Sequence, residues 1–147
     1  GELKPISLLK QDIPLMGHRV ISPGTAKTMS NMLEMATKPG GTAPLAQING
    51  YRVAGKTGTA HKLIDGQYAK KRYIATFVGY APASNPRLII AVMIDEPSAG
   101  QHFGGAVAAP VFSKVMANAL HILNIPPDAP ANNVVTFTAV PEIDEEG

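Results

Sequence analysis

Lys56 lies where two short motifs overlap, and the two motifs predict different chemistry. The segment Gly50-Tyr51-Arg52-Val53-Ala54-Gly55-Lys56-Thr57 satisfies the pattern G-x-x-x-x-G-K-[ST], in which loop N–H groups and the lysine hold nucleotide phosphates. The apolar run 88–94 ends in Asp95, which has the form of the strand and magnesium-binding acid that accompany such a loop. The second motif, Lys56-Thr57-Gly58-Thr59, puts a cation and two hydroxyls beside a glycine that lets a ligand approach the backbone closely.

The residues that flank Lys56 favour the second motif. A phosphate loop needs a helix directly after its lysine, because the helix N-terminus helps to hold the phosphates. Here residues 57–62 contain glycine and β-branched residues with no apolar stripe at helical spacing, and residues 51–54 are bulky and strand-forming. We therefore expect Lys56 to lie on a strand, and keep nucleotide binding at Gly50–Thr57 as the alternative.

Three runs with strand composition surround and follow Lys56: 51–62, 73–80 and 88–94. Their connections are too short for helical crossovers, which predicts antiparallel neighbours. The run 88–94 is apolar at every position, so we expect a central strand that is covered on both faces. Near the N-terminus, residues 3–10 and 18–21 predict two further short strands around a turn at 14–17.

Two helices are predicted. Ser22-Pro23 supplies an N-cap and a first-turn proline for a helix that runs to about residue 37, with a core-facing stripe of Met29, Met32, Leu33 and Ala36. A second helix is expected from about 106 to 123, with Pro110 in its first turn and a buried stripe of Val111, Val115, Ala119 and Ile122. Strands and helices together predict an α/β fold of the α+β type, an antiparallel sheet packed with helices.

Composition limits the classes of function. The 147 residues are 45% hydrophobic and contain no cysteine, which excludes disulfides, cysteine-ligated zinc and a thiol nucleophile. Residues 1–125 hold all 13 Lys+Arg and 6 of the 11 acids, whereas 126–147 hold five acids and no base. Aromatic residues are few at 5% and nucleic-acid motifs are missing, so we expect no nucleic-acid partner. The histidines are too scattered for a metal site, and no cofactor is expected.

This charge division also suggests how the chain is organised. Residues 1–125 form the predicted folded portion, and the proline-rich, acidic residues 126–147 are expected to be a mobile tail. The chain starts Gly1-Glu2-Leu3 without a leader pattern, so we expect any address or membrane anchor to lie upstream.

Several further segments give Lys56-Thr57-Gly58-Thr59 a family context. The four residues resemble the Lys-Thr-Gly motif of penicillin-binding proteins and serine β-lactamases. The likeness extends over about residues 1–128 and includes Gly1-Glu2-Leu3-Lys4-Pro5, Ala81-Pro82-Ala83, Asp95-Glu96-Pro97 and Phe103-Gly104-Gly105-Ala106-Val107-Ala108-Ala109-Pro110-Val111-Phe112. The chain is similar to the C-terminal part of a class B penicillin-binding transpeptidase domain, most like the septal enzyme of Gram-negative bacteria.

The resemblance implies roles for particular residues. Lys56 and Thr59 would be catalytic: the lysine supports proton transfer, and the Thr59 N–H is one of two oxyanion donors. The same resemblance assigns substrate binding to seven residues: Lys56, Thr57, Gly58, Thr59, His102, Phe103 and Gly104. Strict strand alternation sends the side chains of Lys56 and Thr57 to opposite faces, so a shared site would have to wrap around the sheet edge.

The implied partners and location follow from the same resemblance. They are peptidoglycan stem peptides and β-lactams, the N-terminal remainder of the transpeptidase domain, and divisome proteins that include a glycan polymerase. The implied location is the periplasmic side of the inner membrane.

One further motif, Ser7-Leu8-Leu9-Lys10, fits the Ser-x-x-Lys pattern of the family's nucleophile. It precedes Lys56 too closely and lies in a predicted strand instead of a helix, so we regard it as coincidence. None of the serines has Asn two positions later, and the nucleophile is expected outside this chain. A non-catalytic binding module that keeps the motif is the remaining alternative.

Overall fold

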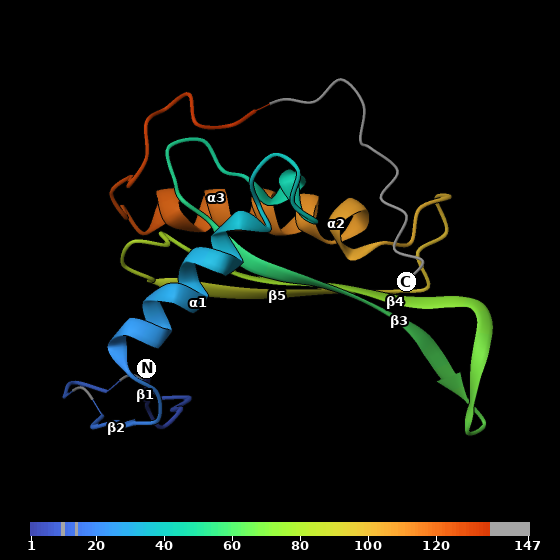
Figure 1. Cartoon of the computed structure of the whole chain (residues 1–147), viewed down its shortest axis with the longest axis horizontal. Helices are drawn as coiled ribbons and strands as arrows, with labels where there is room; N and C mark the ends of the chain where they lie inside the picture. The colour runs from blue at the N-terminus through green and yellow to red at the C-terminus, as the bar shows by residue number, and fades with distance from the viewer. Residues whose placement is uncertain (10, 14, 136–147) are drawn as a thin grey trace.

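The computed structural model describes residues 1–9, 11–13 and 15–135. Its centre is an antiparallel sheet in the order β3-β4-β5, formed by β3 (Ala54–Ile64), β4 (Gln67–Ala81) and β5 (Leu88–Asp95). Helices α2 (Gly104–Val107) and α3 (Ala109–Ile122) lie on one face of this sheet (Figure 1). The predicted mixed fold with an antiparallel sheet is confirmed.

The β3–β4 hairpin is longer than predicted. Asp65 and Gly66 connect the strands with φ values of 50° and 79°. Two positive φ values are typical of the tight hairpin turns in which Asp-Gly is favoured. The register then shifts between His61 and Leu63, and Lys71, within the β4 segment that forms this bulge, has a φ of 60°. A bulge bends a strand, and in Figure 1 the hairpin turns away from the sheet at its outer end.

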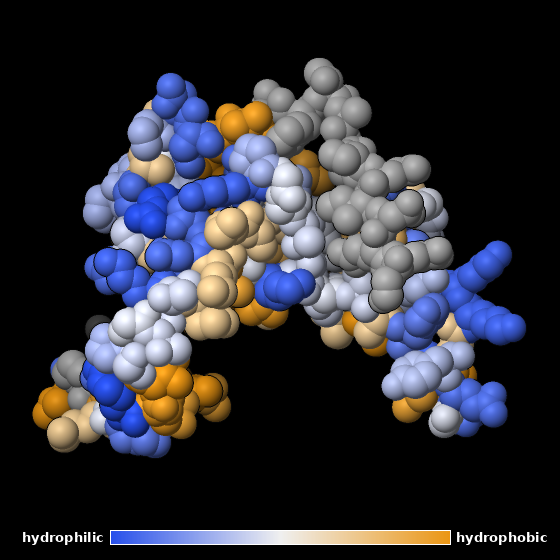
Figure 2. Space-filling view, viewed as in Figure 1, coloured by the Kyte–Doolittle hydropathy of each residue, from blue (hydrophilic) through white to orange (hydrophobic). Residues whose placement is uncertain are grey.

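The prediction that 88–94 forms a central, doubly covered strand is wrong for the part of the chain that the structure describes. β5 is an edge strand, and its residues alternate between half-buried and exposed. Ile89 and Met93 are 73% and 68% exposed. The reason is that α2 and α3 cover one face, while the opposite face borders open space beneath an arch whose legs are the outer hairpin and the α1 region (Figure 2).

The core lies between the sheet and α3. Phe77 of β4 meets Phe112 of α3 edge to face, with ring centroids 4.8 Å apart. The buried stripe of α3 consists of Ala109, Phe112, Met116 and Leu120. The predicted stripe is therefore wrong, because Val111, Val115 and Ile122 are exposed. Two apolar stripes run along this helix. The stripe that contains the larger side chains of Phe112 and Met116 fills the core, and the predicted stripe lies beside it.

Helix α1 (Pro23–Met35) begins as predicted. The Ser22 hydroxyl accepts a hydrogen bond from the Thr25 N–H at 3.0 Å, and Pro23 starts the helix. Its predicted core stripe is wrong in this chain, because Met29 and Met32 are exposed and the buried residues near its end are Glu34 and Thr37. The C-terminal end of α1 contacts the sheet, and its N-terminal part projects away from the sheet (Figure 1). Within the described residues, Met29 and Met32 therefore remain exposed.

The N-terminal strands are shorter than predicted. β1 (Glu2–Leu3) pairs antiparallel with β2 (His18–Arg19), and residues 4–9 form no strand. Ser7 bonds locally to the Leu9 carbonyl at 2.8 Å, while Lys10 lies outside the described residues. The second predicted helix is also divided, at Ala108, although Pro110 does fall in the first turn of α3.

The polypeptide continues to pack on the body beyond residue 125, where we expected the fold to end. Asp128 and Asn133 form hydrogen bonds to residues 48–52, which precede β3. Residues 136–147, which hold the other predicted tail residues, lie outside the described part. Within the described ranges, none of the helices is long and apolar enough to cross a bilayer.

Candidate active site

Lys56 is positioned by strand β3, and β3 runs without interruption to Ile64. A strand after the lysine cannot supply the helix N-terminus that a phosphate loop requires. Asp95, the magnesium ligand of that alternative, is instead paired with Lys62 at 2.8 Å. The structure therefore excludes the nucleotide-binding arrangement at Gly50–Thr57.

The free edge of β3 brings Lys56 and Thr57 together. Among the residues that the structure describes, β3 pairs with β4 on one side and has no neighbouring strand on the other. The exposed Lys56 side chain curls back, and its Nζ lies 3.1 Å from the Thr57 carbonyl oxygen and 3.3 Å from Thr57 Oγ1. Thr57 Oγ1 in turn donates to Thr42 Oγ1 at 3.3 Å. A cation and two hydroxyls thus meet around the sheet edge, an arrangement suited to binding a carboxylate.

Thr59 connects the strand to the start of α2. Its cross-strand neighbour is Ala75, and that of Thr57 is Phe77. Both neighbours belong to the buried face, so the two threonines face the helical layer. Thr59 Oγ1 accepts a hydrogen bond from the Gly104 N–H at 3.2 Å. The first turn of α2 is thereby fixed against the strand that carries Lys56.

The close contact between α2 and β3 requires glycine. A Cβ on Gly104 would collide with the Thr76 carbonyl oxygen and lie 2.8 Å from that of Gly58. A Cβ on Gly58 would collide with Thr76 Oγ1, which donates to the Gly58 carbonyl oxygen at 3.3 Å. Lys56, Thr57, Gly58, Thr59 and Gly104 therefore form one assembly.

A line of rings extends from this assembly along the sheet. His61 and Tyr73 have centroids 4.7 Å apart, Tyr73 stacks on His102 at 4.0 Å, and His102 contacts Phe103 at 4.3 Å. The predicted site residues His102 and Phe103 are thus joined to the strands through Tyr73. These rings give the edge of the candidate site an aromatic wall.

Sequence reasoning missed Thr42 and Tyr73 as members of this region. Tyr73 could have been found from the hairpin register, because it lies opposite His61. Thr42 had no sequence signal, since its approach to Thr57 depends on how the loop after α1 folds back.

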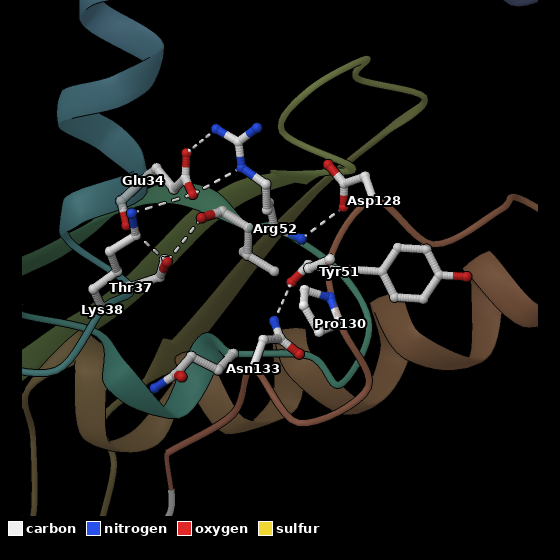
Figure 3. Close-up of a pocket in the computed structure, with 11 residues that line it drawn as sticks. Glu34, Thr37, Lys38, Tyr51, Arg52, Asp128, Pro130 and Asn133 are labelled. Atoms are coloured by element: carbon white, nitrogen blue, oxygen red, sulfur yellow. Dashed lines mark hydrogen bonds and ion pairs between the residues drawn. The ribbon is translucent and has the colours of Figure 1, made fainter.

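An ion pair between helix α1 and the residues just before β3 fixes the start of that strand. Arg52 donates from Nε and a terminal nitrogen to the two carboxylate oxygens of Glu34 at 3.0 and 2.6 Å (Figure 3). The hydrogen bonds from Arg52 lower the pKa of the Glu34 carboxyl, against the opposing effect of burial, and those bonds raise the pKa of Arg52. Lys38 adds a weaker contact to Glu34 at 3.4 Å.

A cavity of about 350 Å³ borders this ion pair and the segment 128–133. Its lining includes no residue from 56–59 or 102–104, so it is separate from the candidate active site. Across the described ranges, every buried side-chain nitrogen and oxygen has a hydrogen-bond partner. The polar groups around the cavity therefore serve to join α1, the approach to β3 and the C-terminal segment.

A second group of charges lies where the hairpin leaves the sheet. Lys62 contacts Asp95 and Glu96 at 2.8 and 2.7 Å, and Arg72 contacts Glu96 at 2.7 Å. Hydrogen bonding to Asp95 is the main cause that raises the pKa of Lys62, and hydrogen bonding to Lys62 is the main cause that lowers the pKa of Glu96. This cluster joins β3, β4 and the end of β5 outside the candidate site.

The fold agrees with sequence comparison. A family model described as the penicillin-binding protein transpeptidase domain matches residues 1–117. This chain belongs to that family.

Comparison with individual proteins shows which members of the family this chain resembles. A probable peptidoglycan D,D-transpeptidase PenA of Neisseria flavescens is 46% identical over 136 residues, which is 92% of this chain and 34% of that protein. The peptidoglycan D,D-transpeptidase FtsI of Escherichia coli K12 is 47% identical over 130 residues, which is 88% of this chain and 22% of that protein. The chain therefore spans between about a fifth and a third of the length of these relatives.

Solved structures agree with the fold. The apo structure of the TP domain from Burkholderia pseudomallei penicillin-binding protein 3 matches with a TM-score of 0.80 and 48% identity, over 88% of this chain and 40% of that one. A peptidoglycan glycosyltransferase from Burkholderia ambifaria matches with a TM-score of 0.75 and 42% identity, over 88% of this chain and 38% of that one.

Proposed function

We propose that this chain is the substrate-holding part of a peptidoglycan D,D-transpeptidase. The observation that supports it best is the position of Lys56-Thr57-Gly58-Thr59 on the free edge of β3, within the residues that match the family. The reaction is acyl transfer: a serine attacks the D-Ala-D-Ala carbonyl, D-Ala leaves, and an amine of a second stem peptide takes the acyl group. β-Lactams would acylate the same serine.

In this proposal the edge of β3 supplies binding and electrostatic stabilisation. The terminal carboxylate of the stem peptide would accept hydrogen bonds from Thr57 and lie beside the Lys56 ammonium group. The Thr59 N–H would donate to the oxyanion as it forms, because a backbone donor fixed by a sheet needs no reorganisation. The peptide would lie along the open edge as an added strand, and Gly58 would allow its close approach.

The wall beside this edge would contact the substrate's side chains. Phe103 and His102 are the proposed wall residues, and Gly104 anchors them to β3 through the Thr59 hydroxyl. His102 and Phe103 are both half-buried, so each keeps a surface that a ligand can contact.

The nucleophile would come from the N-terminal remainder of the transpeptidase domain. The matched segment makes up only 34% and 22% of the length of the PenA and FtsI relatives. The face of the sheet away from α3 also exposes the apolar side chains of Val78, Ile89 and Met93. We propose that this remainder packs under the arch seen in Figure 2 and carries the serine to the β3 edge. Because Ser7 bonds locally to Leu9, it is not our candidate.

The cellular setting is part of the same proposal. We place the protein on the periplasmic side of the inner membrane, in septal peptidoglycan synthesis, with divisome proteins and a glycan polymerase as partners. The sequence resemblance to the septal enzymes of Gram-negative bacteria supports this setting, and similarity to relatives named peptidoglycan D,D-transpeptidase supports its peptidoglycan substrate.

The Thr59 N–H can be tested with fluorescent penicillin. In the full-length protein, Thr59→Pro removes the donor and should lower the acylation rate by about 100-fold or more. Thr59→Ser keeps the N–H and the hydroxyl and should label at nearly the wild-type rate. Unchanged labelling of Thr59→Pro would disprove the oxyanion assignment, and wild-type protein that does not label would instead indicate a non-catalytic module.

A further inference from the structure

We propose that residues 125–135, here called the strap, position strand β3 for catalysis, with Asp128 and Asn133 as positioning residues. The proposal rests on the proposed function. The strap lies beyond the residues that match the family model, which end at 117. Its contacts fall on residues 48–52, directly before the strand that carries Lys56.

Asn133 holds the turn that precedes β3. Its Oδ1 accepts from the Gly50 N–H at 2.8 Å, and its Nδ2 donates to the carbonyl oxygens of Ile48 and Tyr51 at 3.3 and 2.9 Å. The Gly50 carbonyl oxygen accepts from the Asp128 and Ala129 N–H groups at 3.2 and 3.0 Å. Gly50 has a φ of 79°, so the turn needs glycine here and is bonded to the strap on both backbone groups.

Asp128 binds the backbone of Arg52, two residues after Gly50. Its Oδ1 accepts from the Arg52 N–H at 2.7 Å (Figure 3). Its Oδ2 accepts from the N–H and Oγ of Ser84 at 3.1 and 2.6 Å. The Arg52 carbonyl oxygen accepts from the Ala83 N–H at 2.8 Å. With its guanidinium bound to Glu34, Arg52 is fixed through its N–H, its carbonyl and its side chain.

These bonds determine how β3 enters the sheet. Thr37 Oγ1 also donates to the Val53 carbonyl oxygen at 2.7 Å, and Ala54 then begins the strand. Lys56 follows Arg52 by four positions and lies two residues after the start of β3. Within the described residues, β3 pairs with β4 along one edge and has no neighbouring strand along the other. A shift at Arg52 would therefore pass to the Lys56–Thr59 backbone, where an error of about 1 Å can lower a rate 100-fold.

The test is acylation of the full-length protein at saturating fluorescent penicillin, with the labelled amplitude recorded beside the rate constant. Asp128→Ala removes the acceptor for the Arg52 N–H, and we expect the acylation rate constant of the molecules that label to fall by about tenfold or more. A purely stabilising role would lower the labelled amplitude and leave that rate constant unchanged. Hydrogen exchange of the peptide 53–60 should also accelerate in Asp128→Ala, because an anchor before the strand is lost.

Two control variants separate the bond to Arg52 from the bonds to Ser84. Asp128→Asn keeps an oxygen for the Arg52 N–H and should restore most of the rate constant. Ser84→Ala removes one hydroxyl bond and should leave rate and exchange at wild-type values. A wild-type rate constant together with unchanged exchange in Asp128→Ala would overturn the proposal. Failure of the wild-type protein to label refutes the proposed function instead, and the exchange measurement still decides whether the strap orders β3.

Discussion

The candidate site depends on two residues that lack side chains. Gly58 and Gly104 allow β3, β4 and α2 to approach within a distance that a methyl group would fill. Their contribution is geometric: Gly104 places its N–H 3.2 Å from Thr59 Oγ1, which joins the aromatic wall to the edge strand. The position of Lys56 on the edge of β3 therefore depends on the close packing of the β3, β4 and α2 backbones.

Gly104→Ala tests this packing. The new methyl group would meet the carbonyl oxygens of Thr76 and Gly58, so α2 must move away from β3. We expect a loss of about 1–3 kcal/mol in the free energy of unfolding, measured by urea denaturation. Gly24→Ala, whose Cβ would have Ser22 Oγ as its nearest neighbour at 3.8 Å, should be neutral or stabilising by up to about 1 kcal/mol. Equal stability of the two variants would contradict the close-approach argument.

The ion pair of Glu34 with Arg52 should make the free energy of unfolding depend on pH. The pKa of Glu34 is lowered below the ordinary value of 4.5 by hydrogen bonding to Arg52, so the folded protein binds the Glu34 proton less tightly than the unfolded chain. The carboxylate therefore stabilises the fold above pH 4.5, and this contribution disappears as pH falls through the lower folded-state pKa. Glu34→Gln should cost about 1–3 kcal/mol at neutral pH, and the difference from wild type should shrink in acid.

The exposed ion pair of Glu2 with Arg19 provides the matched control. Its two side chains are about half exposed, and exposed pairs contribute at most about 1 kcal/mol. Glu2→Gln should change the free energy of unfolding little at neutral pH. A Glu34→Gln difference that stays constant down to about pH 3 would contradict the linkage.

At the residue scale, the sequence predicts what local pattern can encode. Lys56 on a strand, the Ser22 cap and the first-turn prolines are properties of adjacent residues, and each was confirmed. Thr42 and the acceptor role of Asp128 depend on segments distant in sequence, and no local pattern reveals such meetings.

At the element scale, α3 shows where periodicity is insufficient. Two apolar stripes run along the helix one residue apart, and spacing alone does not decide which one faces the sheet. Phe112 and Met116 fill the core, while Val111 and Val115 of the predicted stripe are exposed. The same difficulty arises at β5, whose apolar composition indicates burial on two faces without specifying what covers each face.

Substitution on the two stripes gives a direct comparison. Met116→Ala removes a fully buried side chain and should lower the free energy of unfolding by about 2–5 kcal/mol. Val115→Ala, one position earlier and 49% exposed, should cost less than about 1 kcal/mol, because exposed positions tolerate truncation. Thermal or urea unfolding distinguishes them, and a larger loss for Val115→Ala would restore the stripe predicted from sequence.

At the scale of the whole molecule, the uncovered surface is apolar where a second layer would pack. Ile89 and Met93 project from the face of β5 opposite α3, and Met29 and Met32 lie exposed on α1. A contiguous apolar surface on a protein commonly marks an interface. The face of the sheet away from α3 borders the open space in Figure 2, where we place the N-terminal remainder of the domain.

Cysteine labelling can measure whether that face is covered, because the chain contains no cysteine of its own. Met93→Cys should react rapidly with a maleimide in the isolated chain and at least about tenfold more slowly in the full-length protein, where packing excludes the reagent. Modification is read by mass spectrometry on the peptide that contains position 93. Gln67→Cys, at the exposed start of β4, should react equally in both. If position 93 reacts at the same rate in both proteins, the face is open in the whole molecule, and the serine must reach the edge of β3 by another route.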